Sequence, residues 1–178
     1  MITHPYIEDY MNSFDRGEIV LNQERILLFD YLRKYVLNRD DLYFNNEMIE
    51  NYVLFTEKQY FKLNAFQKFI IPFVFLYHKE DDELFYEQYY ITMSRGGGKN
   101  GLITSFANFF ISPLHGIDNY DVSVVANSED QAKVSFKEMY ECITKNNLEK
   151  WFNVTKMQIT GVDTNLSLIT SPSPRDRG

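Results

Sequence analysis

The chain has 178 residues, and its 25 acidic and 18 basic side chains give it a net charge of −7. Hydrophobic residues make up 44% of the chain, which is enough for one globular α/β domain and excludes a disordered protein. The single cysteine, Cys142, excludes a disulfide framework, and the acidic balance excludes a protein that coats nucleic acid through bulk positive charge.

The sequence predicts neither a membrane span nor export. The longest apolar run, residues 69–77, is far shorter than the roughly 20 residues that cross a bilayer. The N-terminus lacks the basic start and the apolar stretch of a secretion signal, so we expect no leader peptide.

The first half of the chain has the periodicity of helices. Apolar residues recur at helical spacing over residues 7–14, over a stretch that follows the potential N-cap Asn22 and ends near residue 38, over a stretch that begins at residue 45 or 46, and over residues 64–77. Pro72 is expected to kink the fourth helix or to move its start. The charged residues 79–83 predict a solvated turn. Residues 1–84 are therefore predicted to form a helical layer.

The second half alternates between strands and helices. Residues 85–93 predict a strand, and a glycine-rich stretch and a helical pattern through residue 110 follow it directly. Residues 121–126 predict a buried strand, Ser128 and Gln131 have capping-box spacing at the start of another helix, and residues 151–160 supply a third strand. This alternation predicts a doubly wound parallel sheet.

The glycine-rich stretch has the layout of a phosphate-binding loop. Gly96, Gly97 and Gly98 would let backbone N–H groups turn inward around phosphate oxygens, because no Cβ blocks the approach. The helix that begins there would add its dipole, and Lys99 would add a positive charge. The alternative is a flexible glycine turn between a strand and a helix.

The loop departs from the common pattern G-x-x-x-x-G-K-[S/T] at two positions. Met93 stands at the first glycine, and Asn100 stands at the hydroxyl residue. Arg95 is interpreted either as a cation beside the γ-phosphate or as a surface cation that ties the loop to a carboxylate. His4, His78 and His115 have no ligand-like spacing, so we expect structural roles for them.

Several motifs together resemble one known family. The sequence reads YIEDY at residues 6–10, RGEIV at 16–20, LNAFQKFII at 63–71, SRGGGKNG at 94–101 and VVANSEDQAK at 124–133. From about residue 6 to residue 165 the chain resembles the N-terminal ATPase half of the tailed-phage terminase large subunit. The motifs come in the family's order, and 32 positions separate both Gln67 from Lys99 and Lys99 from Gln131.

The resemblance assigns roles to individual residues. Gln67 would hydrogen-bond the adenine edge of ATP, and Ser94 to Asn100 would form a divergent Walker A loop in which Lys99 contacts the terminal phosphates. Arg95 would act as a sensor or finger supplied in cis, so Arg95 and Lys99 are the expected catalytic residues. ATP and Mg²⁺ are the implied cofactors. Asn100, whose amide oxygen can ligate Mg²⁺, is a weaker ligand than the usual hydroxyl residue.

The resemblance also implies a fold and a division of the chain. The fold is an α/β P-loop NTPase of the additional-strand type, with a parallel sheet, an N-terminal helical layer and an incomplete C-terminus. Residues 1–84 are expected to lead into the adenine-recognition segment, and residues 85–165 to form a partial ATPase core. Residues 166–178 read LSLITSPSPRDRG, which resembles a translated sequencing adapter, so this tail is expected to be non-native.

The implied activity is that of a DNA-packaging motor which couples ATP hydrolysis to translocation of viral DNA into a capsid. Its expected partners are double-stranded viral DNA, the portal protein, the small terminase subunit and further copies in a homo-oligomeric ring. Its expected place is the cytoplasm of the bacterial host. No Walker B Asp-Glu or nuclease carboxylates occur before Gly178, so we expect this chain alone to hydrolyse ATP poorly. The alternatives are a non-catalytic prophage remnant that binds nucleotide and a helicase-like P-loop ATPase.

Overall fold

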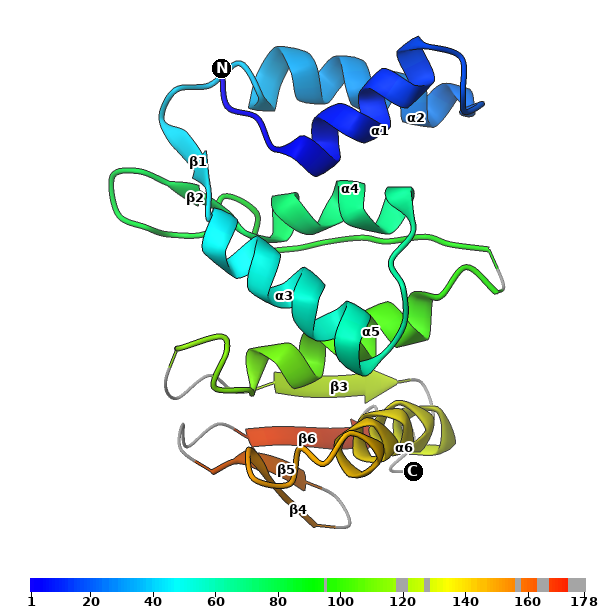
Figure 1. The fold of residues 1–178 in the computed structure, drawn as a ribbon, viewed down its shortest axis with the longest axis vertical. Helices are drawn as coiled ribbons and strands as arrows, with labels where there is room; N and C mark the ends of the chain where they lie inside the picture. Colours follow the sequence, from blue (N-terminus) through cyan, green and yellow to red (C-terminus); the bar gives the residue numbers. More distant parts are fainter. Residues whose placement is uncertain (95, 118–121, 127–128, 156–157, 163–166, 173–178) are drawn as a thin grey trace. The chain divides into compact units, whose positions relative to one another are not determined.

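The computed structural model describes the chain except residues 95, 118–121, 127–128, 156–157, 163–166 and 173–178 (Figure 1). The described helices and strands, in chain order, are α1 (Pro5–Asp15), α2 (Gln23–Tyr31), the π-helical turn η1 (Leu32–Val36), β1 (Leu42–Phe44), α3 (Asn46–Gln59), α4 (Ala65–Val74), β2 (Leu76–His78), α5 (Lys99–Phe110), β3 (Val122–Ala126), α6 (Glu129–Lys145), β4 (Phe152–Val154), β5 (Gln158–Gly161) and β6 (Ser167–Pro172).

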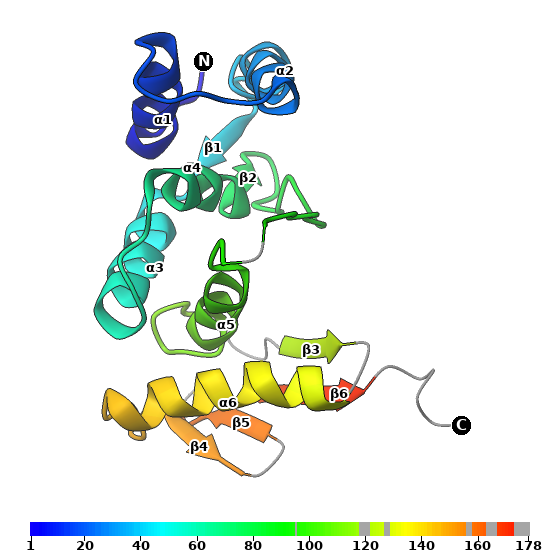
Figure 2. The same cartoon turned by 90° about the vertical axis from the view of Figure 1, so that its right-hand side faces the viewer.

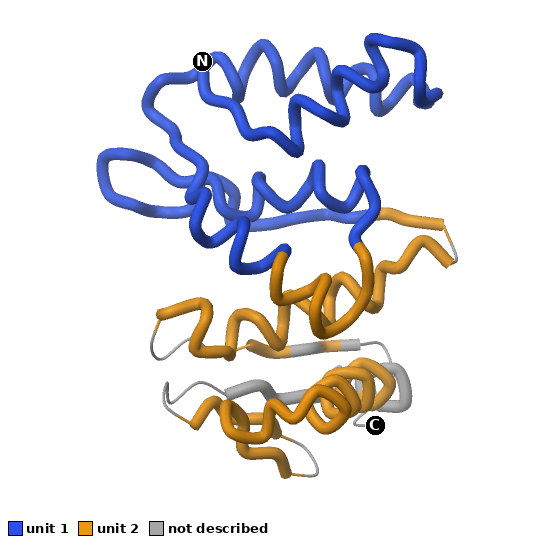
Figure 3. Tube along the Cα trace, viewed as in Figure 1, with its two compact units in different colours: residues 1–53, 63–91 blue, residues 54–62, 92–178 orange. Residues whose placement is uncertain are grey.

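The chain folds into two compact units, which Figure 3 shows in two colours. Unit 1 comprises residues 1–53 and 63–91, and unit 2 comprises residues 54–62 and 92–178. The boundary falls within α3, between Val53 and Leu54. The last turns of α3 and the residues after it therefore belong to the unit that also contains α5.

Side-chain caps fix where the helices of unit 1 begin. The Asn22 side chain accepts a hydrogen bond from the backbone N–H of Arg25, which confirms the predicted N-cap of α2. The Asn45 side chain does the same for the N–H of Met48 at the start of α3. These short-range bonds satisfy donors that every helix leaves unpaired at its N-terminus, so the sequence alone places these helices well.

The fourth predicted helix is shorter than its periodicity indicated. α4 ends at Val74, two residues after Pro72, whereas the helix was predicted to reach Tyr77. Pro72 has no N–H to donate, and the backbone N–H of Phe75 turns back to the Pro72 carbonyl at 3.0 Å. Pro72 thus lies in the last turn of α4, and the residues that follow form β2.

Aromatic rings form the core of unit 1. Tyr10, Phe29 and Phe69, from α1, α2 and α4, are all buried, and their ring centroids lie 5.0–5.9 Å apart. Phe73, one turn further along α4, extends the cluster with its centroid 5.6 Å from that of Phe69. Three of the predicted helices, α1, α2 and α4, therefore turn apolar side chains towards one cluster.

The predicted strand over residues 85–93 does not form. Its first residue bonds to β2 instead: the backbone N–H of Phe85 donates to the Leu76 carbonyl at 2.8 Å. The preceding residue, Leu84, forms an isolated antiparallel β-bridge with Tyr77. β2 itself pairs antiparallel with β1, so that Tyr43 stands opposite Tyr77. A strand requires a hydrogen-bonded neighbour, and among the described residues no strand pairs with the stretch from residue 86 to residue 93.

Unit 2 contains a mixed sheet of strand order β3-β6-β5-β4, along which α6 packs (Figure 2). β3 and β6 are parallel, whereas β5 is antiparallel to both β6 and β4. The predicted all-parallel sheet is therefore not what the described residues form. The stretch over residues 151–160 was predicted to be one strand but contains two, β4 and β5. They pair in the antiparallel sense, as strands joined by a short connection do.

β6 belongs to the tail that was predicted to be non-native. Its backbone pairs with β3 from Val122 opposite Leu168 to Ala126 opposite Pro172. A ladder of backbone hydrogen bonds needs no particular side chains, so this pairing does not depend on where the tail sequence comes from. The origin of residues 166–178 stays a prediction.

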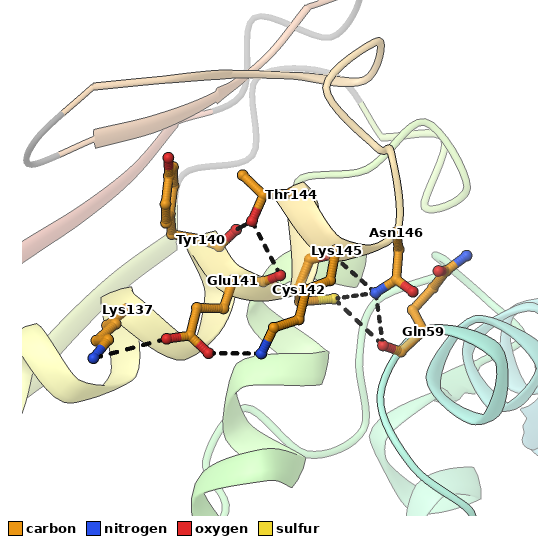
Figure 4. Close-up of polar contacts among 8 residues, drawn as sticks. All are labelled: Gln59, Lys137, Tyr140, Glu141, Cys142, Thr144, Lys145 and Asn146. Carbon is orange, nitrogen blue, oxygen red and sulfur yellow. Dashed lines mark hydrogen bonds and ion pairs between the residues drawn. The ribbon is translucent and has the colours of Figure 1, made fainter.

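A set of polar side chains joins the end of α3 to α6 within unit 2 (Figure 4). The Asn146 Nδ2 donates to the carbonyls of Gln59 and Cys142, at 2.9 Å each. Cys142 is buried, and its Sγ lies 3.7 Å from the Gln59 carbonyl. On the exposed side of α6, Glu141 pairs with Lys137 and Lys145. Directional bonds therefore position α6 in this unit.

None of the helices in the described part of the chain has the length and apolar character needed to cross a membrane.

Candidate functional site

The glycine-rich loop turns sharply into α5 through two glycines with positive φ. Gly96 has φ +85° and Gly98 has φ +81°, a region that side chains with a Cβ rarely adopt. Gly98 is the N-cap of α5, and its carbonyl accepts the N–H of Leu102 at 3.0 Å. Glycine is therefore favoured at both positions, because the backbone that leads into α5 is in the left-handed conformation there.

Gly97 is required for a different reason, which is space. A Cβ at Gly97 would lie 3.1 Å from the Ser94 carbonyl oxygen and 3.2 Å from the Met93 Cβ. The backbone N–H of Gly97 already donates to that carbonyl at 3.0 Å, so the loop is a closed turn. The backbone conformation or the space around it therefore favours glycine at each of the three positions. A flexible linker would not impose such requirements.

The first residues of α5 present an open, positively polarised helix end. Lys99 and Asn100 are the first two residues of α5, and both are exposed. The first turn contains no acidic residue, and no side chain caps it. In the described part of the chain no carboxylate forms an ion pair with Lys99. Unpaired N–H groups, the helix dipole and a free ammonium group together suit an anion.

The predicted loop residues are consecutive in the chain, and their predicted roles toward a nucleotide stay predictions. Ser94 and the three glycines precede α5, and Lys99 and Asn100 are its first two residues. Arg95, predicted beside the γ-phosphate, lies outside the described residues, and so does the predicted N-cap Ser128. The role of Arg95 stays a prediction.

Gln67 has a local role that competes with its predicted contact to adenine. Its side-chain oxygen accepts the backbone N–H of Asn64 at 3.0 Å, while the Asn64 side chain accepts the N–H of Gln67 at 2.9 Å. This pair is a capping box at the start of α4, and Gln67 is only 3% exposed. Any contact to adenine would have to share the carboxamide with this cap.

Two residues that the sequence analysis missed hold α5 in place. A Cβ at Gly101 would lie 2.8 Å from the ring of Phe61, so the first turn of α5 packs directly on that ring. The Tyr60 hydroxyl donates to the Thr104 carbonyl at 3.2 Å and accepts a hydrogen bond from the Asn108 Nδ2 at 2.6 Å. Gly101 was the one signal in the sequence, because a glycine inside a helix often marks close packing.

Two of the three histidines, His4 and His115, have structural roles, as predicted. His4 caps α1, since its Nδ1 accepts the N–H of Tyr6 at 3.2 Å, and burial lowers its pKa against the opposing effect of Glu50. His115 is buried with its Nδ1 3.0 Å from the Phe110 carbonyl, and burial lowers its pKa as well. Among the described residues, no three His, Cys, Asp or Glu side chains are placed to bind one metal ion.

Comparison with known proteins gives a likeness in fold. Neither a protein-family model nor a curated protein matches this sequence. Among solved structures, the chain is similar to the crystal structure of the HK97 bacteriophage large terminase, with a TM-score of 0.61 and 19% sequence identity. The likeness covers 71% of this chain and 27% of that chain, so this chain spans about a quarter of the other protein.

A fold likeness of this size confirms what the motifs predicted: the chain has the mixed α/β fold of part of a terminase large subunit. At 19% identity the comparison carries the fold and not the activity. The chemistry has to be argued from the loop and the helix end described above.

Proposed function

We propose that the loop of residues 94–98 and the first turn of α5 bind the phosphates of ATP. The observation that carries this proposal is the open N-terminus of α5. Two glycines in the left-handed conformation, Gly96 and Gly98, lead into it, and the exposed Lys99 has no ion-pair partner among the described residues. Backbone N–H groups of Gly96 and Gly98 would hold phosphate oxygens, and Lys99 would neutralise the terminal phosphates. The N–H of Gly97 donates to the Ser94 carbonyl, so it would join them only if that bond opened.

The remaining predicted ligands enter the proposal with smaller roles. Arg95 would stabilise the charge that develops on the γ-phosphate during transfer. Gln67 would contact adenine through the part of its carboxamide that the α4 capping box does not use. Mg²⁺ would arrive bound to the phosphates and neutralise their charge. Asn100 is the one loop side chain that would offer it an oxygen, and the described residues hold no metal-binding cluster of their own.

We further propose that the chain is part of a terminase large subunit, the ATP-driven motor that moves viral DNA into a capsid. The fold likeness and the order of the sequence motifs support this assignment. The partners would then be double-stranded DNA, the portal protein, the small terminase subunit and further copies in a ring, in the cytoplasm of the bacterial host. Nucleotide binding without turnover is the second candidate, because the described residues hold no cluster of carboxylates that could bind Mg²⁺ and orient the attacking water.

The test is a titration of the full chain with a fluorescent ATP analogue in the presence of Mg²⁺. Lys99→Ala should lower the affinity by at least about tenfold, because a charge-assisted hydrogen bond to phosphate is lost. Lys58→Ala, which removes an exposed lysine of α3, is the control and should leave the affinity unchanged. Equal affinities for Lys99→Ala and the unaltered chain would refute the phosphate site.

Turnover is measured separately, as phosphate release with and without DNA. Release that depends on Lys99 and increases with double-stranded DNA would support the motor. Nucleotide binding without release would support the second candidate.

A further inference from the structure

Residues 78–88 of unit 1 form a groove that the phosphate chemistry does not use. The groove has a volume of about 620 Å³ and follows the turn between β2 and the extended chain after it. Its lining includes the carboxylates of Glu80, Asp81, Glu83 and Glu87 and the rings of Phe85 and Tyr86. We call this surface the acidic groove.

The carboxylates at the rim of the acidic groove lack basic partners. Glu80, Glu83 and Glu87 are exposed, and no basic side chain in the described part of the chain forms an ion pair with any of them. The nearby Lys79 turns away from the rim, since its Nζ donates to the Asp40 carbonyl at 2.6 Å. Among the described residues, no ion pair therefore neutralises the carboxylates of the rim.

The turn that carries these carboxylates is held in shape. Asp82 has φ +57°, and its side chain accepts the Tyr43 hydroxyl hydrogen at 2.8 Å. The backbone N–H of His78 donates to the Glu83 carbonyl at 2.9 Å, and the N–H of Glu83 donates to the Asp81 side chain at 3.0 Å. A fixed turn loses little entropy when it binds a partner, so the rim is preorganised.

The floor of the acidic groove is aromatic and already contacts one cation. The rings of Phe85 and Tyr86 lie 4.5 Å apart, edge to face, and the Arg39 guanidinium carbon lies 5.1 Å from the Phe85 centroid. Burial, with a smaller effect of the nearby Tyr31 hydroxyl, raises the pKa of Tyr86. Tyr31, the last residue of α2, is 51% exposed.

Charge and geometry exclude most classes of partner for the acidic groove. Phosphate backbones and anionic lipid surfaces would be repelled by the rim. Among the described residues no three ligands converge on a metal ion. A second copy of this chain carries the same net charge of −7, which opposes self-association here. Cationic side chains fit, because carboxylates attract them and aromatic faces bind them by cation–π contact.

We propose that the acidic groove docks a basic segment of a partner protein. Arginine or lysine side chains of that segment would pair with Glu80, Glu83 and Glu87, and an apolar side chain would pack against Tyr86. This surface is independent of the proposed ATP site, so it can be present even if Lys99 binds no phosphate.

The experiment uses the full chain and a short fluorescent peptide of alternating arginine and leucine. The triple variant Glu80→Lys, Glu83→Lys, Glu87→Lys reverses the rim, and these exposed side chains make no hydrogen bonds that the fold needs. Asp9→Lys, Glu24→Lys, Glu149→Lys is the control, since it changes the net charge by the same amount at exposed positions elsewhere. Circular dichroism checks that both variants stay folded.

The affinity for the peptide should fall by more than about tenfold in the rim variant and by less than about twofold in the control. A peptide with glutamine in place of arginine should bind neither variant. Equal losses in the two variants would assign the binding to net charge and overturn the proposal, as would the absence of binding to the unaltered chain. A dimer of the unaltered chain that the rim variant cannot form would assign the groove to a second copy and also overturn it.

Discussion

Both units of this protein bury aromatic rings, such as Phe69 in unit 1 and Phe109 in unit 2, but different contacts hold their helices together. In unit 1 the helices meet around packed rings, with Tyr10, Phe29 and Phe69 buried against one another. In unit 2 buried polar groups join the helices, such as Asn108, which is fully buried and bonded to the Tyr60 hydroxyl. Ring packing stabilises in proportion to the buried area, whereas hydrogen bonds also fix direction. The helix α5, into which the glycine-rich loop leads, belongs to unit 2, where hydrogen bonds from Tyr60 and Asn108 fix its orientation.

Removal of a ring from unit 1 should have the largest effect on stability. Phe69→Ala leaves a cavity among Tyr10, Phe29 and Phe73, so the free energy of unfolding should fall by about 3–5 kcal/mol. Denaturant unfolding followed by circular dichroism measures this loss. Tyr35→Ala is the control at a position that is 52% exposed, where the change should stay within about 0.5 kcal/mol. Similar losses for both variants would contradict the ring-packed core.

Removal of one hydroxyl group should have a smaller effect in unit 2. Tyr60→Phe keeps the ring but leaves the Thr104 carbonyl and the Asn108 Nδ2 without that partner, so unfolding should become about 1–2 kcal/mol easier. The matched control is Tyr35→Phe, which removes an exposed hydroxyl from unit 1. If Tyr60→Phe and Tyr35→Phe were equally stable, directional bonds would not distinguish the two units.

The smallest expected effect is a dependence on pH that both units share. Burial lowers the folded-state pKa of His4 in unit 1 and of His115 in unit 2 below the ordinary value near 6.5. The unfolded chain therefore binds more protons around that pH, so the contribution of these neutral histidines is complete above pH 6.5 and is lost as the pH falls towards the folded-state pKa.

Unfolding curves at pH 7 and pH 5 measure this loss in the unaltered chain and in the variants His4→Gln and His115→Gln. Each variant should lose less stability on acidification than the unaltered chain does. A pH response that neither substitution reduces would show that other groups cause it.

Much of the fold could be predicted because its determinants are local. Asn22 and Asn64 accept N–H groups three residues ahead in the chain, so the sequence places the starts of α2 and α4. The glycines of the loop could be identified for the same reason, because a positive φ is a property of one residue. The sequence alone therefore located the candidate phosphate-binding loop, from Ser94 to Lys99, directly before a helix.

Long-range partners could not be predicted from the same sequence. Residues 85–93 have the composition of a strand, yet the N–H of Phe85 finds its acceptor on β2 and the rest finds no ladder among the described residues. The sheet of unit 2 is mixed because β5 pairs with β4 and β6 in the antiparallel sense. Composition favours extended chain, but only a neighbour decides whether a strand forms.

By itself, then, the sequence determined where helices of unit 1 begin, that a glycine-rich turn precedes α5, and the likeness to a terminase fold. The tertiary structure decided that Phe61 packs on Gly101, that Gln67 is used as a cap, and that an aromatic floor lies beneath the acidic rim of residues 80–87. The physical reason is distance along the chain. Caps and turns satisfy hydrogen bonds within a few residues, whereas packing depends on side chains that only the folded chain brings together.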